Sequence, residues 1–260
     1  MDCKVSIIMP AYNAEKFISK SIDSIKEQTF HDWELIVVDD CSTDNTPELV
    51  EEIATGDPRI SIVKLNKNYG GPAGPRNQGV RLASAELVAF CDSDDLWHPK
   101  KLEIQMGLYT GEKNFFCASK IKNFYQDLNV THDNVDCIQV EDITFIIQSL
   151  KSRIPTSSVV ISRSLVLNYK FNEDKAYKAV EDYHCWLRVL DSGTVCRKVL
   201  NSLVHYRISD GQISASKLTM LKKVFMVHRN YPERSIFMAF IYTCSHALGG
   251  LYAHLIKREM

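Results

Sequence analysis

The sequence predicts an α/β fold in which a mostly parallel central sheet carries helices on both faces. Two observations lead to this prediction. Short strands alternate with helix-length segments through the first hundred residues or so. These strands are apolar throughout, which is typical of a parallel sheet covered on both faces. The length of 260 residues and the hydrophobic content of 45% are ordinary for a folded globular chain.

Four apolar runs in the first half predict strands, at residues 5–9, 35–38, 60–65 and 87–91. We expect helices over 14–28, onward from a cap at Ser42 or Thr43, over 76–83, and from Pro99 to about Tyr109. The second half is less regular. It predicts strands at 115–119 and 158–162, a helix over 182–190, and a polar loop over 123–136.

No linker rich in glycine or serine separates these segments. We therefore expect one continuous domain with two halves, residues 1–105 and 106–215, followed by a helical tail over 216–260. Residues 236–256 of the tail leave three alternatives: an amphipathic helix on a membrane surface, a helix packed on the core, or a membrane span. Ser245, His246 and His254 argue against a span, whereas basic residues on both sides favour a surface anchor on anionic lipid.

Charge and cysteine content narrow the classes of partner and compartment. The formal net charge of −1 gives no electrostatic reason to expect a nucleic-acid partner. The eight cysteines are scattered, without a C-x-x-C pair or a zinc-ligand spacing. The start of the sequence lacks the basic and apolar regions of a signal peptide. We expect free thiols and a cytosolic location.

Polar clusters follow three of the predicted strands. They are Pro10-Ala11-Tyr12-Asn13, Asp39-Asp40-Cys41-Ser42 and Asp92-Ser93-Asp94-Asp95. Ligands of open parallel sheets bind at the carboxyl ends of the strands, so these clusters are expected to meet at one rim.

The cluster with three carboxylates predicts a metal site. Asp92, Asp94 and Asp95 repel one another unless a cation lies between them. Oxygen ligands of this kind suit Mg²⁺ or Mn²⁺, which keeps some waters and also binds phosphate oxygens. The alternative is an acidic turn that caps the helix after Pro99.

The other two clusters and a glycine-rich loop are suited to a nucleotide. Asp39 and Asp40 can accept hydrogen bonds from a base or ribose, although Asp is also a routine turn residue. Tyr12 could cover the flat face of a base. Arg76 follows the loop Gly70-Gly71-Pro72-Ala73-Gly74-Pro75, where it could pair with phosphate. The P-loop pattern is absent.

Together these motifs resemble family 2 glycosyltransferases of GT-A fold. The segments that carry the resemblance are residues 5–13, 38–46 and 92–95, with Gly79 and Glu181-Asp182 in addition. The resemblance is dense from Lys4 to about Gln105, thinner from Pro155 to Ser214, and absent beyond. It makes residues 1–105 the nucleotide-sugar half and 106–215 the half that holds the acceptor and the catalytic base.

The resemblance implies a role for each matching residue. Pro10, Tyr12 and Asp40 match positions that hold the nucleobase, with Ala11 in the same segment and Asp39 nearby, and Arg76 matches a position near the nucleotide. Asp92, Ser93 and Asp94 form the D-x-D motif, which contacts the ribose and the metal-bound diphosphate. Asp95 could share the metal role.

Asp182 matches the catalytic base of the family, which would take the proton of the attacking sugar hydroxyl. Its residue pattern also predicts a helix start, and both roles can coexist. The family reacts by single displacement with inversion.

The segment 205–214 resembles one near the diphosphate, but its usual histidine is displaced. We place His205 at the end of a strand, with contact to ligand or metal as the alternative. The Q-x-x-R-W motif of processive synthases is missing, so one sugar per encounter is expected.

The expected function is transfer of one sugar from a nucleotide-sugar donor, UDP-linked by family habit over GDP or dTDP, to a saccharide or lipid-linked acceptor. The resemblance places this in assembly of a bacterial surface polysaccharide (capsule, O-antigen or lipopolysaccharide), at the inner face of the cytoplasmic membrane. One alternative is a sugar-1-phosphate nucleotidylyltransferase, but residues 10–15 lack the Gly- and Arg-rich loop of such enzymes. Another is a non-catalytic nucleotide-sugar-binding protein, against which Asp94 and Asp182 count.

Overall fold

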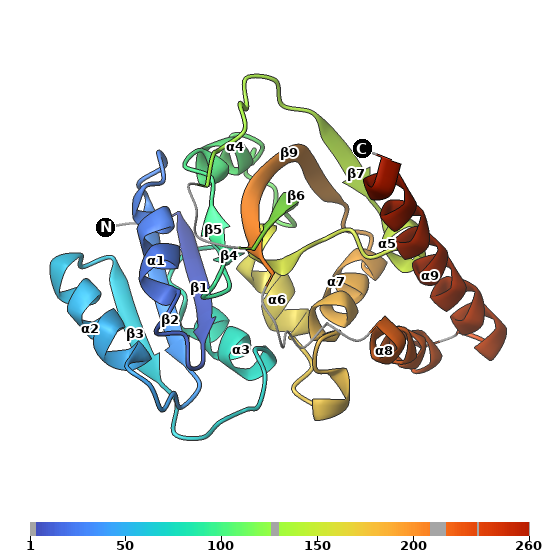
Figure 1. The fold of residues 1–260 in the computed structure, drawn as a ribbon, viewed down its shortest axis with the longest axis horizontal. Helices are drawn as coiled ribbons and strands as arrows, with labels where there is room; N and C mark the ends of the chain where they lie inside the picture. The colour runs from blue at the N-terminus through green and yellow to red at the C-terminus, as the bar shows by residue number, and fades with distance from the viewer. Residues whose placement is uncertain (1–3, 126–129, 209–216, 233, 260) are drawn as a thin grey trace.

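The computed structural model describes residues 4–125, 130–208, 217–232 and 234–259, with side chains described as far as Leu248 (Figure 1). Within this part of the chain, nine strands form one sheet: β1 (Val5–Ala11), β2 (Trp33–Asp39), β3 (Ile60–Lys64), β4 (Leu87–Phe90), β5 (Leu96–Trp97), β6 (Phe116–Phe124), β7 (Val140–Ile143), β8 (Val160–Ser162) and β9 (Cys196–Arg207). Their order is β3-β2-β1-β4-β8-β6-β9-β5, and β7 also pairs with β9.

The helices are α1 (Ile18–Lys26), α2 (Thr46–Gly56), α3 (Ala73–Leu82), α4 (Lys101–Met106), α5 (Phe145–Leu150), α6 (Arg163–Tyr169), α7 (Glu181–Asp191), α8 (Lys217–Arg229) and α9 (Ile236–Glu259), with short 3₁₀ helices η1 (Thr156–Ser158) and η2 (Lys175–Tyr177). Alternate residues of each strand face opposite sides of the sheet. In β1, Ile7 and Met9 pack with α1, α2 and α4, whereas Ile8 packs with α3, α6 and α7. This two-sided cover explains the uninterrupted apolar strands and confirms the predicted α/β class.

The two halves of the sheet differ in strand direction. β3, β2, β1 and β4 are parallel neighbours, as the sequence predicts. β8 is antiparallel to both β4 and β6, and β6 is parallel to β9. The second half is therefore mixed. Its longest strand, β9, pairs with β5, β6 and β7, which are far from one another in sequence.

Four helix starts in the first half, those of α1 to α4, differ from the sequence prediction by two to four residues. α2 begins at Thr46, and neither Ser42 nor Thr43 caps it. Asn45 occupies the cap position without a side-chain cap bond, and Asp44 before it accepts hydrogen bonds at Oδ1 from the Thr46 amide (3.0 Å) and hydroxyl (2.6 Å). The Ser42 hydroxyl accepts one from the Asn13 amide (2.9 Å) and so joins two strand ends. The first helix begins at Ile18 instead of Ala14.

Close contact between α3 and β1 fixes the position of Arg76. A Cβ atom on Gly79 would lie 2.4 Å from Ile8 Cγ2, so only glycine allows α3 to approach the sheet this closely. Arg76 lies one turn earlier on the same helix, and it is buried at the end of β4.

The tail helices α8 and α9 lie at the opposite end of the molecule from α2 and β3 (Figure 1). α9 packs against α5 and α8, with Ala239 buried at this contact. Its other side leaves Phe237, Phe240 and Leu248 exposed. No helix in the described ranges is long and apolar enough to cross a membrane. His254 and the basic residues after it have no described side chains.

Candidate functional site

The ends of β1, β2 and β4 bring the three polar clusters to one rim. Ala11 is in register with Asp39, and the Asp40 amide donates to the Ala11 carbonyl (2.8 Å). The Cys91 amide donates to the Ile8 carbonyl (3.1 Å), which places the third cluster alongside. Asn13 and Cys41 follow the first two strands with φ of 49° and 63°. Such positive angles in non-glycine residues are strained and concentrate at functional sites.

The nucleotide side offers one open aromatic face and one unused buried acceptor. Tyr12 is 53% exposed, as a side chain that covers a base must be. Asp39 is buried, and its Oδ2 accepts from the Ser42 amide (3.1 Å), whereas Oδ1 has no partner among the described residues. Because a buried acceptor without a donor is costly, Asp39 Oδ1 is suited to a ligand N–H or O–H. Pro10 and Ala11 are buried within β1.

Asp40 holds the glycine-rich loop. Its Oδ1 accepts from the Tyr69 amide (2.8 Å), and its carbonyl accepts from the Asn68 side chain (2.6 Å). Burial raises the pKa of Asp40, against the lowering effect of the loop amides. The carboxylate therefore fixes the loop, and its contact with a nucleobase stays a prediction.

Arg76 joins the acidic cluster to the start of α7. Its Nη2 donates to Asp92 Oδ1 (2.7 Å) and its Nη1 to Glu181 Oε1 (3.1 Å). The residue is 3% exposed. Burial works to lower the pKa of Arg76, but Asp92, Glu181 and Asp182 outweigh it and raise the pKa, so the guanidinium stays charged. Its charge is directed at carboxylates, and pairing with phosphate stays a prediction.

The acidic cluster holds carboxylates that resist ionisation. Burial and the charge of Asp92 raise the pKa of Asp94 to about 6. Burial and both neighbouring carboxylates raise the pKa of Asp95 well above its ordinary value. Asp95 Oδ1 accepts from the Arg207 amide (3.0 Å), and this fully buried contact ties the end of β9 to the cluster. Ser93 is anchored through its carbonyl, which accepts from the Ser21 hydroxyl (2.9 Å).

These residues fit a metal ion that takes only one or two ligands from the protein. Across the described ranges, no three His, Cys, Asp or Glu side chains form a cage that could hold a metal ion. Mg²⁺ and Mn²⁺ do not need one, since one or two carboxylates together with waters and substrate phosphates suffice. A cation would relieve the repulsion that raises the pKa of Asp94.

Asp182 lies across the rim from the acidic cluster, in the first turn of α7. Its Oδ2 accepts from the Thr156 hydroxyl (2.9 Å) and its Oδ1 from the Tyr183 amide (2.6 Å). The predicted helix start is confirmed to within one residue, since α7 begins at Glu181, but Val180 and not Asp182 occupies the cap position. Asp182 is half-buried and lines a cavity of about 440 Å³. Two bonds orient the carboxylate and leave lone pairs for an incoming hydroxyl.

His205 lies near the end of β9, as expected, and is buried. Its Nε2 is 3.2 Å from Nδ1 of His132, and burial followed by the charge of His132 lowers its pKa to about 4. Contact with a ligand stays a prediction. Residues 209–214 of the same segment lie outside the described residues.

Several site residues had no sequence signal. Thr156, which orients Asp182, and Ser157, whose hydroxyl accepts from the Asp92 amide (3.1 Å), come from the short helix η1. Four basic residues line the cavity beside Asp182: Lys120, Lys151, Arg153 and Lys198. They are spread over β6, β9 and a loop, and only the topology of the second half brings them together.

Sequence comparison identifies the family. The model of "Glycosyl transferase family 2" matches residues 6–166. Escherichia coli WfgD, named UDP-Glc:alpha-D-GlcNAc-diphosphoundecaprenol beta-1,3-glucosyltransferase, is 32% identical over 97% of this chain and 96% of its own length. Bacillus subtilis TuaG, a putative teichuronic acid biosynthesis glycosyltransferase, is 31% identical over 90% of both chains.

Solved structures agree on the fold. Staphylococcus aureus TarS 1–349 in complex with UDP has a TM-score of 0.65 at 23% identity, over 91% of this chain and 68% of that one. The mannosyltransferase PcManGT from Pyrobaculum calidifontis, in complex with GDP-Man and Mn²⁺, has a TM-score of 0.70 at 18% identity, over 94% and 70%. The likeness confirms the predicted fold class, and the sequence matches leave the nucleotidylyltransferase alternative without support. The chain is a glycosyltransferase and belongs to family 2.

Proposed function

We propose that this enzyme transfers one sugar from a UDP-sugar to a hydroxyl of a lipid-linked saccharide, with a divalent metal and with inversion, in bacterial surface-polysaccharide assembly. The name of WfgD supports both substrates, because it contains a UDP-sugar donor and a diphosphoundecaprenol acceptor. The complexes of TarS with UDP and of PcManGT with Mn²⁺ support the donor and the metal. A cytoplasmic location at the inner face of the membrane agrees with such an acceptor.

In this proposal the donor occupies the half formed by residues 1–105. Tyr12, Asp39 and Asp40 hold the base and ribose at the end of the strand that contains Pro10 and Ala11. Arg76 lies near the nucleotide. Asp92, Ser93 and Asp94 lie beside the diphosphate, and Asp94 and Asp92 would hold the Mg²⁺ or Mn²⁺. When bound, the metal would neutralise negative charge on the departing diphosphate. Asp95 could share this role, although its contact with Arg207 already gives it a positioning one.

The acceptor occupies the half formed by residues 106–215, and the tail 216–260 lies beyond it. Asp182 takes the proton from the acceptor hydroxyl as its oxygen attacks the anomeric carbon. Thr156 and the Tyr183 amide hold the carboxylate in place for this transfer. The hydroxyl attacks from the side opposite the departing diphosphate, so the configuration of the sugar inverts.

One observation carries the proposal: buried Arg76 bonds both Asp92, in the D-x-D motif, and Glu181, next to Asp182. The donor and acceptor halves are thereby held in one arrangement, with Asp92 on one side of a single cation and Glu181, the neighbour of the proposed base, on the other. Such a fixed arrangement is what a direct displacement between two substrates requires.

The first test is calorimetric titration of UDP into the purified protein with and without Mn²⁺. We expect binding that requires the metal and is lost in Asp94→Ala. Asp23→Ala, an exposed carboxylate on α1, is the matched control and should bind as the wild type does. Binding of GDP or dTDP in place of UDP would overturn the donor assignment. Silence with all three nucleotides would point to a degenerate pocket.

A further inference from the structure

Two cavities adjoin on the acceptor side of Asp182. The first, of about 440 Å³, is lined by Asp182 itself. The second, of about 870 Å³, lies between α5 and α9. Lys151 and Arg153 line both, so the two cavities are neighbours, and we call them together the path from the proposed base to the tail helix.

The first cavity is basic. Lys120, Lys151, Arg153 and Lys198 contribute four positive charges, against two negative charges from Glu141 and Asp182. Arg153 Nη1 lies 3.1 Å from Glu141 Oε2, and Lys198 Nζ donates to the Arg153 carbonyl (2.6 Å). Arg153 therefore balances the charge of Glu141, and the remaining lysines outnumber the one remaining carboxylate, Asp182. Such an excess of positive charge suits a ligand with more than one negative charge.

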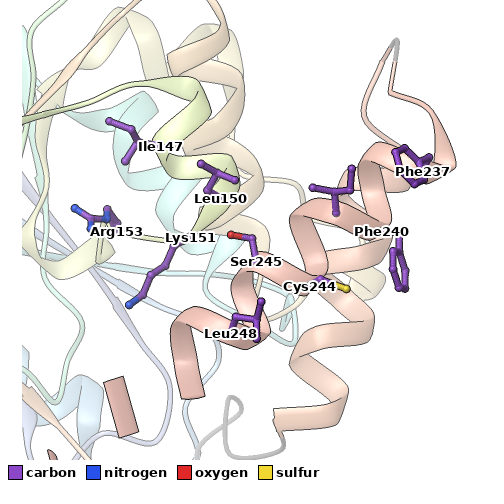
Figure 2. Close-up of a pocket in the computed structure, with 10 residues that line it drawn as sticks. Ile147, Leu150, Lys151, Arg153, Phe237, Phe240, Cys244, Ser245 and Leu248 are labelled. Atoms are coloured by element: carbon purple, nitrogen blue, oxygen red, sulfur yellow. The ribbon is translucent and has the colours of Figure 1, made fainter. Parts of the chain in front are cut away.

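The second cavity is an apolar groove. Ile147 and Leu150 line it from α5, and Phe237, Phe240, Ile241 and Leu248 line it from α9. Phe237, Phe240 and Leu248 are 60–68% exposed, and they recur at helical spacing on one side of α9. Figure 2 shows Leu150 facing Ser245 and Leu248, with Lys151 and Arg153 at one side of the groove and Phe237 and Phe240 at the other.

The opposite side of α9 is fixed to the domain by polar contacts. His246 Nε2 lies 2.9 Å from the Tyr183 hydroxyl and 3.1 Å from the Ser149 carbonyl. Arg234, two residues before α9, donates through Nη2 to the Ser149 hydroxyl (2.9 Å). These contacts fix α9 beside α5, and the exposed apolar side chains of the groove lack a partner in the described part of the chain. Exposed apolar surface of this kind marks a binding site.

We propose that this path binds the acceptor, with its diphosphate in the basic cavity and its lipid chain in the groove between α5 and α9. The order of chemistry along the path carries the proposal: a base, then a cluster of cations, then an apolar groove. A sugar linked through diphosphate to a lipid has the complementary order. The inference rests on the proposed function for the identity of the sugar end, and it makes Lys151 and Leu248 specificity-determining residues.

The test measures binding of farnesyl diphosphate to the whole protein with excess UDP present, so that it does not depend on transfer. We expect binding that weakens about ten-fold or more in Lys151→Glu and about three- to ten-fold in Leu248→Ser or Phe240→Ser. Leu248 and Phe240 are exposed, so these substitutions should leave folding intact. Lys113→Glu and Leu218→Ser, which change exposed residues elsewhere, are the matched controls.

Equal binding by the variants and the wild type would overturn the inference, as would farnesol binding as tightly as farnesyl diphosphate. Leu248→Ser that weakens binding to anionic vesicles, but not to farnesyl diphosphate, would assign the groove to a membrane surface and also overturn it. Binding of farnesyl diphosphate with the expected losses, in a protein that transfers no sugar from any UDP-sugar, would reject the proposed function and keep the lipid diphosphate site.

Discussion

Removing the charge of Arg76 should destabilise the protein, because this residue joins the two sides of the site. Arg76→Met keeps much of the side-chain volume but removes both ion pairs. Glu181, whose side chain is 5% exposed, would be left as a buried charge without its cation. Breaking one partner of a buried pair costs roughly 3–5 kcal/mol of unfolding free energy.

The structure places the expected loss at the lower end of that range. The Arg76–Glu181 pair is buried on both sides, with a separation of 3.1 Å. Asp92 is 30% exposed, so water screens the charge that the substitution leaves there. We therefore expect a loss of about 3 kcal/mol. Burial and Asp182 already raise the pKa of Glu181, so the unpaired carboxyl protonates readily and the loss should shrink as pH falls.

Urea unfolding at neutral pH measures this effect, with Arg76→Met/Glu181→Gln as the partner variant. The double variant removes the stranded charge together with the cation. Its loss of unfolding free energy should therefore be smaller than the sum of the Arg76→Met and Glu181→Gln losses by about 1–3 kcal/mol. A single-variant loss below about 1 kcal/mol, or losses that simply add, would refute the idea that this pair joins the halves.

Three further predictions concern the base, the acidic cluster and the helix contact. Asp182→Asn should lower the transfer rate by about 10²- to 10⁴-fold while UDP affinity by calorimetry stays unchanged, and a rate near that of the wild type would exclude Asp182 as the base. The folded protein holds the Asp94 proton up to about pH 6 against an ordinary pKa of 3.8, so metal-free stability should fall as pH rises through about 6; thermal melts should show a smaller slope in Asp94→Asn, because Asp95 and Glu181, whose pKa values are also raised, still contribute. Gly79→Ala should cost about 1–3 kcal/mol, because the added Cβ meets Ile8 Cγ2 at 2.4 Å. Gly56→Ala, with nothing within 4 Å, should be near neutral, and equal urea midpoints for the two variants would contradict the close α3–β1 contact.

The sequence predicted the strands of residues 1–105 well because their signals are local. Parallel strands such as β1 and β2 are continuous apolar runs, and their carboxyl ends must share an edge once the strands pair. The second half depends on long-range pairing instead. Lys198 faces the cavity because β9 pairs with β6 and β7, and Thr156 reaches Asp182 from a three-residue helix. Neither residue carries a pattern that marks such a position in one sequence.

The tail shows why its three sequence alternatives could not be separated by hydropathy. α9 has one side that packs and one that does not, and residues of both sides alternate along the same apolar stretch. His246, which interrupts that stretch, is the residue that fixes the helix to Tyr183. Tyr183 follows Asp182 directly, and its amide orients the Asp182 carboxylate. Two hydrogen bonds, from His246 to Tyr183 and from the Tyr183 amide to Asp182, therefore connect the groove to the proposed base. We expect His246→Ala to lower both acceptor affinity and turnover. Leu248→Ser should lower acceptor affinity alone.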